Sequence, residues 1–187
     1  MIDVPTPVYS VVAYLPPEAA EELSEKLIAF RLSRYAPFYH LTLRSLFTPV
    51  SEQQAKAEVA RVARHHKPFL VKASGLLRFG DEAERTADAF ALQVIPSPEL
   101  LALHRDLVAT LSGTPHRAQF ELENYVPHVS LVSEAPSKLS RRASAVLTAG
   151  QVECQFTLRQ MVLSQSEGES WANVAAFALG DGQPLPL

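Results

Sequence analysis

The sequence predicts an α+β protein in which one order of strands and helices occurs twice. Two apolar strands that each carry a histidine, around His40 and His128, lie 88 positions apart, and the neighbouring segments recur at about the same offset. Hydrophobic residues make up 47% of the chain and charged residues 20%, which is the balance of an ordinary globular protein. We therefore expect a single domain over residues 1–187, with two pseudo-symmetric lobes around a central cleft. Each lobe should be an antiparallel sheet backed by two helices.

The first repeat covers about residues 7–80 and contains three predicted strands and two predicted helices. Segments rich in β-branched and aromatic residues predict strands over residues 8–15, 39–47 and 69–79. Pro17 opens a helix whose apolar residues recur at three- and four-residue spacing. The segment Ser51-Glu52-Gln53-Gln54 has the form of a capping box, and it predicts a second helix that ends before Pro68.

The second repeat covers about residues 87–165 and is followed by a final strand over residues 171–179. Its predicted strands are residues 87–95, 125–132 and 152–164. Ser97 caps one helix, which ends at Gly113, and Ser137 opens another, which ends at Gly150. Residues 117–124 fit either a loop or an extra edge strand, and no periodicity is visible in residues 180–187.

Each histidine strand contains a short motif in which a hydroxyl follows the histidine by two positions. The motifs are His40-Leu41-Thr42-Leu43 and His128-Val129-Ser130-Leu131. Side chains alternate between the faces of a strand, so each motif presents its imidazole and its hydroxyl together and buries its aliphatic residues. If the two lobes are related by an approximate two-fold axis, His40 and His128 meet in one cleft.

Such a pair has the chemistry needed to open a phosphodiester. An imidazole has an ordinary pKa near 6.5, so one histidine can be neutral and accept a proton from water while the other, protonated, donates to the leaving oxygen. The hydroxyls of Thr42 and Ser130 can donate hydrogen bonds to the non-bridging phosphate oxygens and orient the diester. A single His-x-Ser/Thr segment would be weak evidence, but two at matched positions of a repeated plan favour a catalytic pair.

These features resemble the 2H phosphoesterases, a family named for two His-x-Thr/Ser motifs on facing strands of a duplicated fold. The resemblance extends to the segment from Met161 to Ser166, which leads to an aromatic residue, here Trp171. It implies opening of a 2′,3′-cyclic phosphate or a related RNA-terminal diester without a metal or other cofactor. It also implies that His128 is the base and His40 the acid in hydrolysis, with the roles exchanged in ligation.

Four further residues are candidates for substrate contacts. Arg44 follows Thr42 by two positions, so it should share that face of the strand and bind phosphate. Tyr39, Tyr125 and Trp171 lie near the predicted cleft and could stack on a nucleobase, although packing in the core or at the rim is an equally good interpretation. His104 lies on a helical stripe, where packing is the simpler interpretation.

Composition limits the other function classes. The formal net charge of −3 argues against a protein that coats long duplex nucleic acid, because that affinity requires the neutralisation of many phosphates. The single cysteine allows no internal disulfide, and the histidine spacing suggests no metal site. Without a signal peptide or a membrane span, we expect a cytoplasmic monomer that acts in RNA processing on a small cyclic nucleotide or an RNA 3′ end. The alternatives are 2′-5′ RNA ligation and a non-catalytic module that binds RNA-terminal phosphate.

Overall fold

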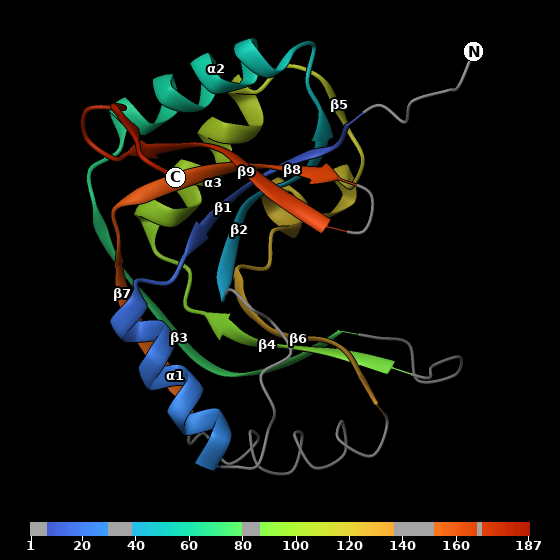
Figure 1. Cartoon of the computed structure of the whole chain (residues 1–187), viewed down its shortest axis with the longest axis vertical. Helices are drawn as coiled ribbons and strands as arrows, with labels where there is room; N and C mark the ends of the chain where they lie inside the picture. The colour runs from blue at the N-terminus through green and yellow to red at the C-terminus, as the bar shows by residue number, and fades with distance from the viewer. Residues whose placement is uncertain (1–6, 30–38, 80–86, 137–151, 168–169) are drawn as a thin grey trace.

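A computed structural model of the chain describes residues 7–29, 39–79, 87–136, 152–167 and 170–187 (Figure 1). The helices are α1 (Pro17–Ala29), α2 (Glu52–His65) and α3 (Pro98–Thr110), with two short 3-10 helices, η1 (Ala118–Phe120) and η2 (Leu122–Asn124). The strands are β1 (Tyr9–Tyr14), β2 (His40–Thr48), β3 (Phe69–Phe79), β4 (Ala87–Val94), β5 (Thr114–Pro115), β6 (His128–Pro136), β7 (Glu153–Leu158), β8 (Gln160–Glu167), β9 (Ser170–Ala178) and β10 (Pro184–Leu185). No helix within these described ranges is long and apolar enough to cross a membrane.

The strands form one continuous antiparallel sheet rather than a separate sheet in each lobe. Its order is β10-β9-β8-β1-β2-β6-β4-β3-β7, with β5 paired to β2. The expected α+β class with antiparallel strands is thus confirmed, but strands of the two predicted repeats are interleaved along the sheet, with β3 between β4 and β7, β8 beside β1, and β2 paired to β6 at the junction that carries both histidine motifs. The order is similar on both sides of this junction, since β1 flanks β2 and β4 flanks β6.

The helices begin where the sequence provides caps. The Ser51 hydroxyl accepts a hydrogen bond from the Gln54 N–H at the start of α2, and Ser97 does the same for the Leu100 N–H at the start of α3. Helices α2 and α3 pack against each other, with α2 also over β8 and β9 and α3 over β2, whereas α1 packs against β7 (Figure 1). The helices thereby cover the buried face of the sheet and leave other strand positions for a site.

The core lies directly beneath the two histidine motifs. Their aliphatic residues Leu41, Leu43, Val129 and Leu131 are at most 1% exposed and belong to one hydrophobic cluster that runs across both halves. Burial of these side chains fixes which face of β2 and β6 is inward, because a one-residue slip would exchange the faces. The alternation expected from the sequence therefore determines where the histidines point.

Several predicted elements have different boundaries in the structure. The single strand expected over residues 152–164 is two strands, β7 and β8, which pair with different neighbours in separate parts of the sheet. Residues 117–124 contain η1 and η2, so they are not an edge strand. In the tail, Pro184 and Leu185 pair with β9 as β10. The helix expected from Ser137 to Gly150 lies outside the described residues.

Candidate active site

The two histidine motifs lie side by side at the junction of the two halves. In the antiparallel pairing of β2 with β6, His40 is opposite Ser130 and Leu41 is opposite Val129. Residues two apart on a strand share a face, so Thr42 follows His40 and His128 precedes Ser130 on the same face of the sheet. The imidazole of each motif is therefore close to the hydroxyl end of the other motif.

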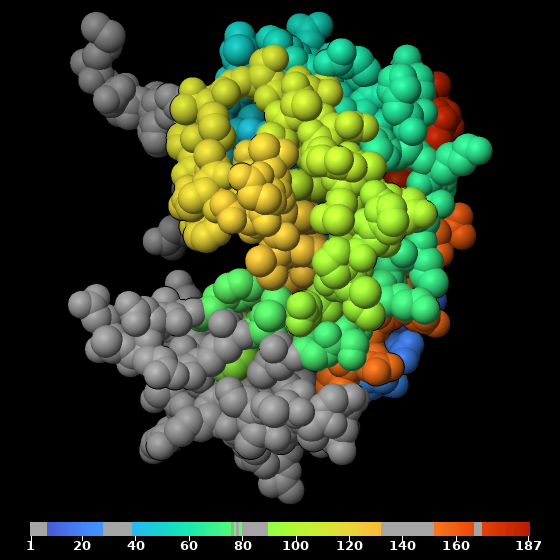
Figure 2. Space-filling model, turned by 180° about the vertical axis from the view of Figure 1, so that it is seen from behind, coloured from blue at the N-terminus to red at the C-terminus, as the bar shows by residue number. Residues whose placement is uncertain are grey.

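All four side chains line one pocket of about 620 Å³. Figure 2 shows the molecule hollowed below the yellow and amber atoms of the segment that leads into β6. The described lining residues are His40, Thr42, Ser45, Phe79, Phe90, Ala91, His104, Arg117, Phe120, Asn124, Tyr125, Val126, His128 and Ser130. The structure thus brings the predicted acid–base and hydroxyl groups to one cavity that is large enough for a small ligand.

Contacts on both sides define the state of His128. Its Nδ1 lies 2.8 Å from the Val126 carbonyl oxygen, which can only accept, so Nδ1 carries the proton. The ring packs against Phe79 with 4.6 Å between centroids. Burial lowers the pKa of His128 below its ordinary value, although the bond to Val126 acts in the opposite direction. Burial thus favours the neutral form of His128, and in that form the lone pair is on Nε2, which is the state that a general base requires.

His40 occupies a half-buried position at the start of β2. Its ring meets that of Tyr14 edge-on, with 6.2 Å between centroids, and the Tyr14 hydroxyl donates to Asn173 Oδ1 at 2.9 Å. The aromatic edge and the adjacent strand limit the ring orientations of His40. The His40 and His128 imidazoles are therefore held by different neighbours, one beside Tyr14 and the other beside Phe79.

The expected placement of Arg44 on the face of His40 and Thr42 is wrong. The pairing of β1 with β2 shifts register between Tyr9 and Val12, where Val11 lies opposite Arg44, and such an irregularity changes the alternation of side chains. Arg44 is consequently turned inward and is only 3% exposed, whereas Ser45 lines the pocket in its place. The Arg44 side chain lies beneath the site rather than among the described lining residues.

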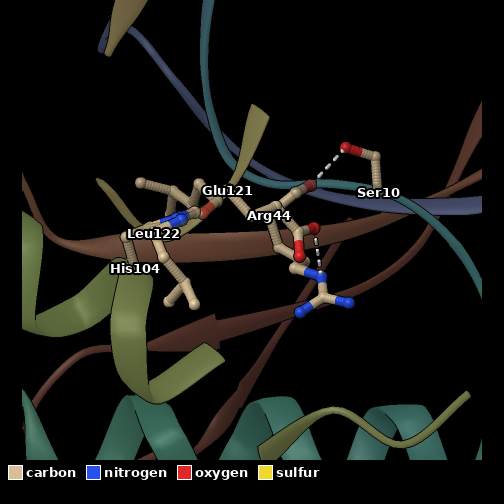
Figure 3. Close-up of polar contacts among 6 residues, drawn as sticks. Ser10, Arg44, His104, Glu121 and Leu122 are labelled. Atoms are coloured by element: carbon tan, nitrogen blue, oxygen red, sulfur yellow. Dashed lines mark hydrogen bonds and ion pairs between the residues drawn. The ribbon is translucent and has the colours of Figure 1, made fainter. Parts of the chain in front are cut away.

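Arg44 instead forms a buried ion pair with Glu121 (Figure 3). The distance from Arg44 Nε to Glu121 Oε1 is 3.0 Å, but the alignment is not that of a hydrogen bond. Burial lowers the pKa of Arg44 and raises that of Glu121, while their mutual attraction opposes both shifts. The Ser10 hydroxyl donates to the Arg44 carbonyl at 2.8 Å, which fixes the strand at this irregular point.

Residues 116–126 form the rim of the pocket, and we call them the rim segment. Three consecutive residues of β2 anchor this segment. The Tyr125 hydroxyl donates to the Thr42 carbonyl at 2.7 Å. His104 Nδ1 lies 2.8 Å from the Leu43 carbonyl, and the Arg44 side chain pairs with Glu121. The rim segment is therefore held to the strand that carries His40 and Thr42.

His104 links this strand to the rim segment through both ring nitrogens. Nδ1 donates to the Leu43 carbonyl, and Nε2 accepts from the Leu122 N–H at 2.9 Å, so the ring is neutral. It stacks on Tyr125 with 3.8 Å between centroids and an interplanar angle of 6°. Burial and the nearby Arg44 lower the pKa of His104, and the bond to Leu43 opposes them. The packing role expected for His104 is thus accompanied by two specific hydrogen bonds.

Comparison with known proteins identifies the family. The family model for the 2′-5′ RNA ligase superfamily matches residues 16–169, which include both histidine motifs. The chain belongs to the 2′-5′ RNA ligase superfamily. The resemblance to 2H phosphoesterases is thereby confirmed, and membership of this superfamily supports an enzyme. Comparison with curated protein sequences gives no significant match.

Solved structures share the fold of this chain over nearly its whole length. The structure of TT0787 from Thermus thermophilus has a TM-score of 0.63 and 20% identity, covering 92% of this chain and 98% of that one. Usb1 from Kluyveromyces marxianus, solved alone and with uridine monophosphate, has a TM-score of 0.52 and 12% identity, covering 89% of this chain and 97% of its own. At these identities the likeness concerns the fold.

The aromatic candidates have three different positions within this superfamily fold. Tyr125 lines the pocket, but its hydroxyl and one ring face are already occupied by Thr42 and His104. Tyr39 is buried at 5% exposure and accepts a hydrogen bond from Ser24, so the packing interpretation holds for it. Trp171 is 50% exposed and is not among the described lining residues.

Sequence reasoning missed several lining residues. Phe79 and Phe90 belong to β3 and β4, and only the sheet order brings them beside the motifs. Ser45 depends on the irregularity in β2, and Phe120 and Asn124 depend on the 3-10 turns of the rim segment. The signal that the sequence offered for Phe120 was an aromatic residue inside a polar stretch.

The electrostatic character of the pocket is neutral to basic. No carboxylate lies among its described lining residues, and Arg117 is an exposed cation on the rim segment. Over the described residues, no group of three or more histidine, cysteine or acidic side chains is arranged to hold a metal ion. The surroundings suit a ligand with a negative charge and an apolar part, because phenylalanine and tyrosine side chains contribute to the walls.

Proposed function

We propose that this protein hydrolyses a 2′,3′-cyclic phosphate, or a related cyclic or RNA-terminal phosphodiester, by acid–base catalysis with two histidines and without a metal. The observation that carries the proposal is the antiparallel pairing of the two motifs, His40 opposite Ser130, at a single pocket. Two imidazoles and two hydroxyls around one cavity meet the needs of an in-line displacement at phosphorus. The substrate is a small cyclic nucleotide or an RNA 3′ end.

In this mechanism His128 is the base and His40 is the acid. Nε2 of His128 takes a proton from water as the water oxygen forms a bond to phosphorus. The bond from phosphorus to one ribose oxygen breaks, and protonated His40 gives that oxygen its proton, leaving a phosphate monoester. The Nδ1 proton of His128, bound to the Val126 carbonyl, supports this assignment because it leaves Nε2 as the acceptor. Each proton transfer is expected to contribute about 10²–10⁴-fold.

Thr42 and Ser130 are proposed to bind the non-bridging oxygens. Both are half-buried, line the pocket, and have hydroxyls that make no hydrogen bond to described residues. Free hydroxyls of this kind can donate to an oxygen whose charge increases in the transition state. Arg44, buried against Glu121, has no part in this proposal.

A nucleotide is the proposed ligand class. The structure of Kluyveromyces marxianus Usb1 with uridine monophosphate supports a nucleotide ligand in this fold. The aromatic walls beside the histidines are suited to a nucleobase, and Tyr125 contributes one of them. Trp171 remains a candidate only for a part of the substrate that extends outside the pocket.

The same groups would catalyse ligation if a ribose hydroxyl attacked the cyclic phosphate instead of water. The name of the matching family, the 2′-5′ RNA ligase superfamily, favours this as the second candidate. A ribose hydroxyl would take the place of water: its oxygen bonds to the phosphorus of the cyclic phosphate while the bond from phosphorus to one ring oxygen breaks, one histidine takes the hydroxyl proton, the other gives a proton to the released oxygen, and a diester forms. A module that captures terminal phosphate without turnover is the third outcome that an experiment has to separate.

The deciding experiment uses nucleoside 2′,3′-cyclic phosphates in excess chelator, with product analysis. We expect a ring-opened monophosphate whose rate of formation falls by at least about a hundredfold in His40→Ala and in His128→Ala. His65→Ala, an exposed histidine at the end of α2, is the matched control and should retain the wild-type rate. Binding of nucleotide without product would identify a capture module instead, and turnover lost on chelation would reject the metal-independent mechanism.

A further inference from the structure

The Val126 carbonyl that binds His128 Nδ1 is itself held in place by its neighbours in the chain. Resting on the function proposed above, we propose that Tyr125 is a positioning residue for the base: it fixes the Val126 carbonyl and so keeps the His128 proton on Nδ1. The side chain of Tyr125 is attached to the Thr42 carbonyl and to the His104 ring. The strand of the first motif thereby sets the tautomer of the histidine in the second.

The Tyr125 side chain is fixed both at its hydroxyl and along its ring. The hydroxyl donates to the Thr42 carbonyl at 2.7 Å, and burial raises the pKa of Tyr125, so this group remains a donor over the pH range of an assay. The ring lies parallel to that of His104, with 3.8 Å between centroids. His104 is only 1% exposed and is bonded through both nitrogens, to the Leu43 carbonyl and the Leu122 N–H. A rotation of Tyr125 would therefore break contacts with two separate elements, β2 and α3.

The backbone on both sides of the Val126 carbonyl is also held. The Tyr125 N–H donates to the Leu122 carbonyl at 3.0 Å. On the other side, the Pro127 carbonyl accepts a hydrogen bond from the Val94 N–H of β4 at 3.0 Å. Because Val126 precedes a proline, its own backbone is restricted to the extended region. The Val126 side chain is 49% exposed, so the orientation of its carbonyl depends on these neighbours rather than on packing of the side chain.

The tautomer decides whether His128 can take a proton from water. A neutral imidazole carries its proton on one nitrogen, and the hydrogen bond made by that nitrogen determines which one it is. With the proton on Nδ1, bound to the Val126 carbonyl, Nε2 has the lone pair that the proposed hydrolysis requires. If this carbonyl turned away, the form with the proton on Nε2 would become populated. That form cannot act as a base at Nε2.

Nitrogen-15 NMR of the histidine rings tests this role, because the chemical shifts of Nδ1 and Nε2 report the tautomer. Spectra are recorded at about pH 8, where an imidazole is neutral, and the His128 signals are identified by their loss in His128→Ala. We expect the Nδ1–H form of His128 in the wild-type protein. Tyr125→Phe keeps the stacked ring and loses the bond to Thr42, so part of His128 should change to the Nε2–H form. Tyr125→Leu loses both contacts, and a larger part should change.

The kinetic effect should fall on kcat rather than on KM. With a nucleoside 2′,3′-cyclic phosphate, kcat should decrease by about tenfold in Tyr125→Phe and by up to about a hundredfold in Tyr125→Leu, because a small displacement of a reacting group has effects of this size. KM should stay close to that of wild type in Tyr125→Phe, since the ring remains in the pocket wall.

The acid limb of the kcat/KM profile should move as well. The bond to Val126 raises the pKa of His128, so weakening that bond should shift the limb to lower pH. Gln93, which lies opposite His128 on β4, is uncharged. The other ionisable side chains of the described pocket wall are His40, His104, Arg117 and Tyr125. Following the His128 signals against pH therefore assigns the limb to this residue.

Tyr9→Phe is the matched control, because Tyr9 is a buried tyrosine of β1 that donates to Glu52 at 3.1 Å and is not among the described lining residues. It should keep the wild-type tautomer, kcat and acid limb. An unchanged His128 tautomer in Tyr125→Phe and Tyr125→Leu, whatever their kcat, would overturn the positioning role, and Tyr125→Phe alone decides if the leucine variant does not fold. Since the spectra need no turnover, a changed tautomer in a protein without activity would reject the proposed function and keep the role of Tyr125.

Discussion

Two histidines of the pocket show how hydrogen-bond partners decide what an imidazole can do. His104 and His128 both donate from Nδ1 to a backbone carbonyl, and burial lowers the pKa of each. They differ at the other nitrogen, because Nε2 of His104 is occupied by the Leu122 N–H. A ring with both nitrogens bonded can support structure only, whereas His128 keeps an acceptor for a substrate proton.

We predict that His104 makes the stability of the protein depend on pH. Because its folded pKa lies below the ordinary value of 6.5, the unfolded chain binds more protons at this residue between those two values. The free energy of unfolding should therefore decrease as the pH falls from 7 to 5. Since the raised pKa of Glu121 acts in the opposite direction, the measurement is urea unfolding of wild type against His104→Phe.

The His104→Phe variant keeps a stacked ring beside Tyr125 and loses both hydrogen bonds. At pH 7 it should be less stable by about 1–3 kcal/mol, because the Leu122 N–H is left without a partner. Its free energy of unfolding should also vary less between pH 5 and 7 than that of wild type. An identical pH dependence in the two proteins would show that His104 does not titrate in this way.

The second prediction at this scale concerns the pH–rate profile. If His128 is the base, kcat/KM should increase with pH through an acid limb that lies below 6.5, since burial lowers the pKa of this histidine. Protonated His40 should produce a second, alkaline limb and a bell-shaped curve. The profile is measured from pH 4.5 to 9 at constant ionic strength. A flat profile would contradict a histidine pair.

At the scale of elements, the irregular point in β2 organises the site. It separates the side chains that face the pocket, His40, Thr42 and Ser45, from Arg44, which faces the interior. The carbonyls of Thr42 and Leu43 and the side chain of Arg44 hold the rim segment, through Tyr125, His104 and Glu121 respectively. Strand β2 thus positions both the reacting groups and the opposite wall of the pocket.

We predict that Arg44→Ala affects folding more than substrate binding. Glu121 would be left buried without its partner, and loss of one member of a buried ion pair costs about 3–5 kcal/mol. Arg44→Met combined with Glu121→Leu removes both charges and should recover most of that loss. Guanidinium unfolding of the single and paired variants measures this. A wild-type stability with reduced kcat/KM in Arg44→Ala would instead support a direct contact with substrate.

At the scale of the whole molecule, the site exists because the two halves of the chain share one sheet. His40 comes from the first half and His128 from the second, and they meet through the pairing of β2 with β6. The hydrophobic cluster beneath them also draws residues from both halves. The site therefore requires strands from both halves of the chain.

This arrangement predicts non-additive kinetics. If the two imidazoles act on the same phosphorus, removing one already stops the concerted proton transfers, so the second removal costs little more. The double variant His40→Ala/His128→Ala should retain kcat/KM within about tenfold of the weaker single variant. Single-turnover assays with a cyclic nucleotide test this. If the loss of kcat/KM in the double variant equalled the product of the losses in the two single variants, the histidines would act independently.

The sequence determined the features that depend on local patterns. Alternation around His40 and His128 predicted which residues are buried, because a strand has only two faces, and Ser51 and Ser97 predicted helix starts. The matched motifs were also sufficient to indicate the superfamily that the comparison confirms. Each of these inferences uses residues only a few positions apart.

Only the tertiary structure decided what depends on pairing between distant segments. A register shift against β1 turned Arg44 inward and placed Ser45 in the pocket, and no residue type in β2 signals that shift. Likewise, the continuous sheet and the division of residues 152–164 between β7 and β8 follow from the pairing of strands far apart in the chain. Strand order and register are set by global packing, which a local pattern does not contain.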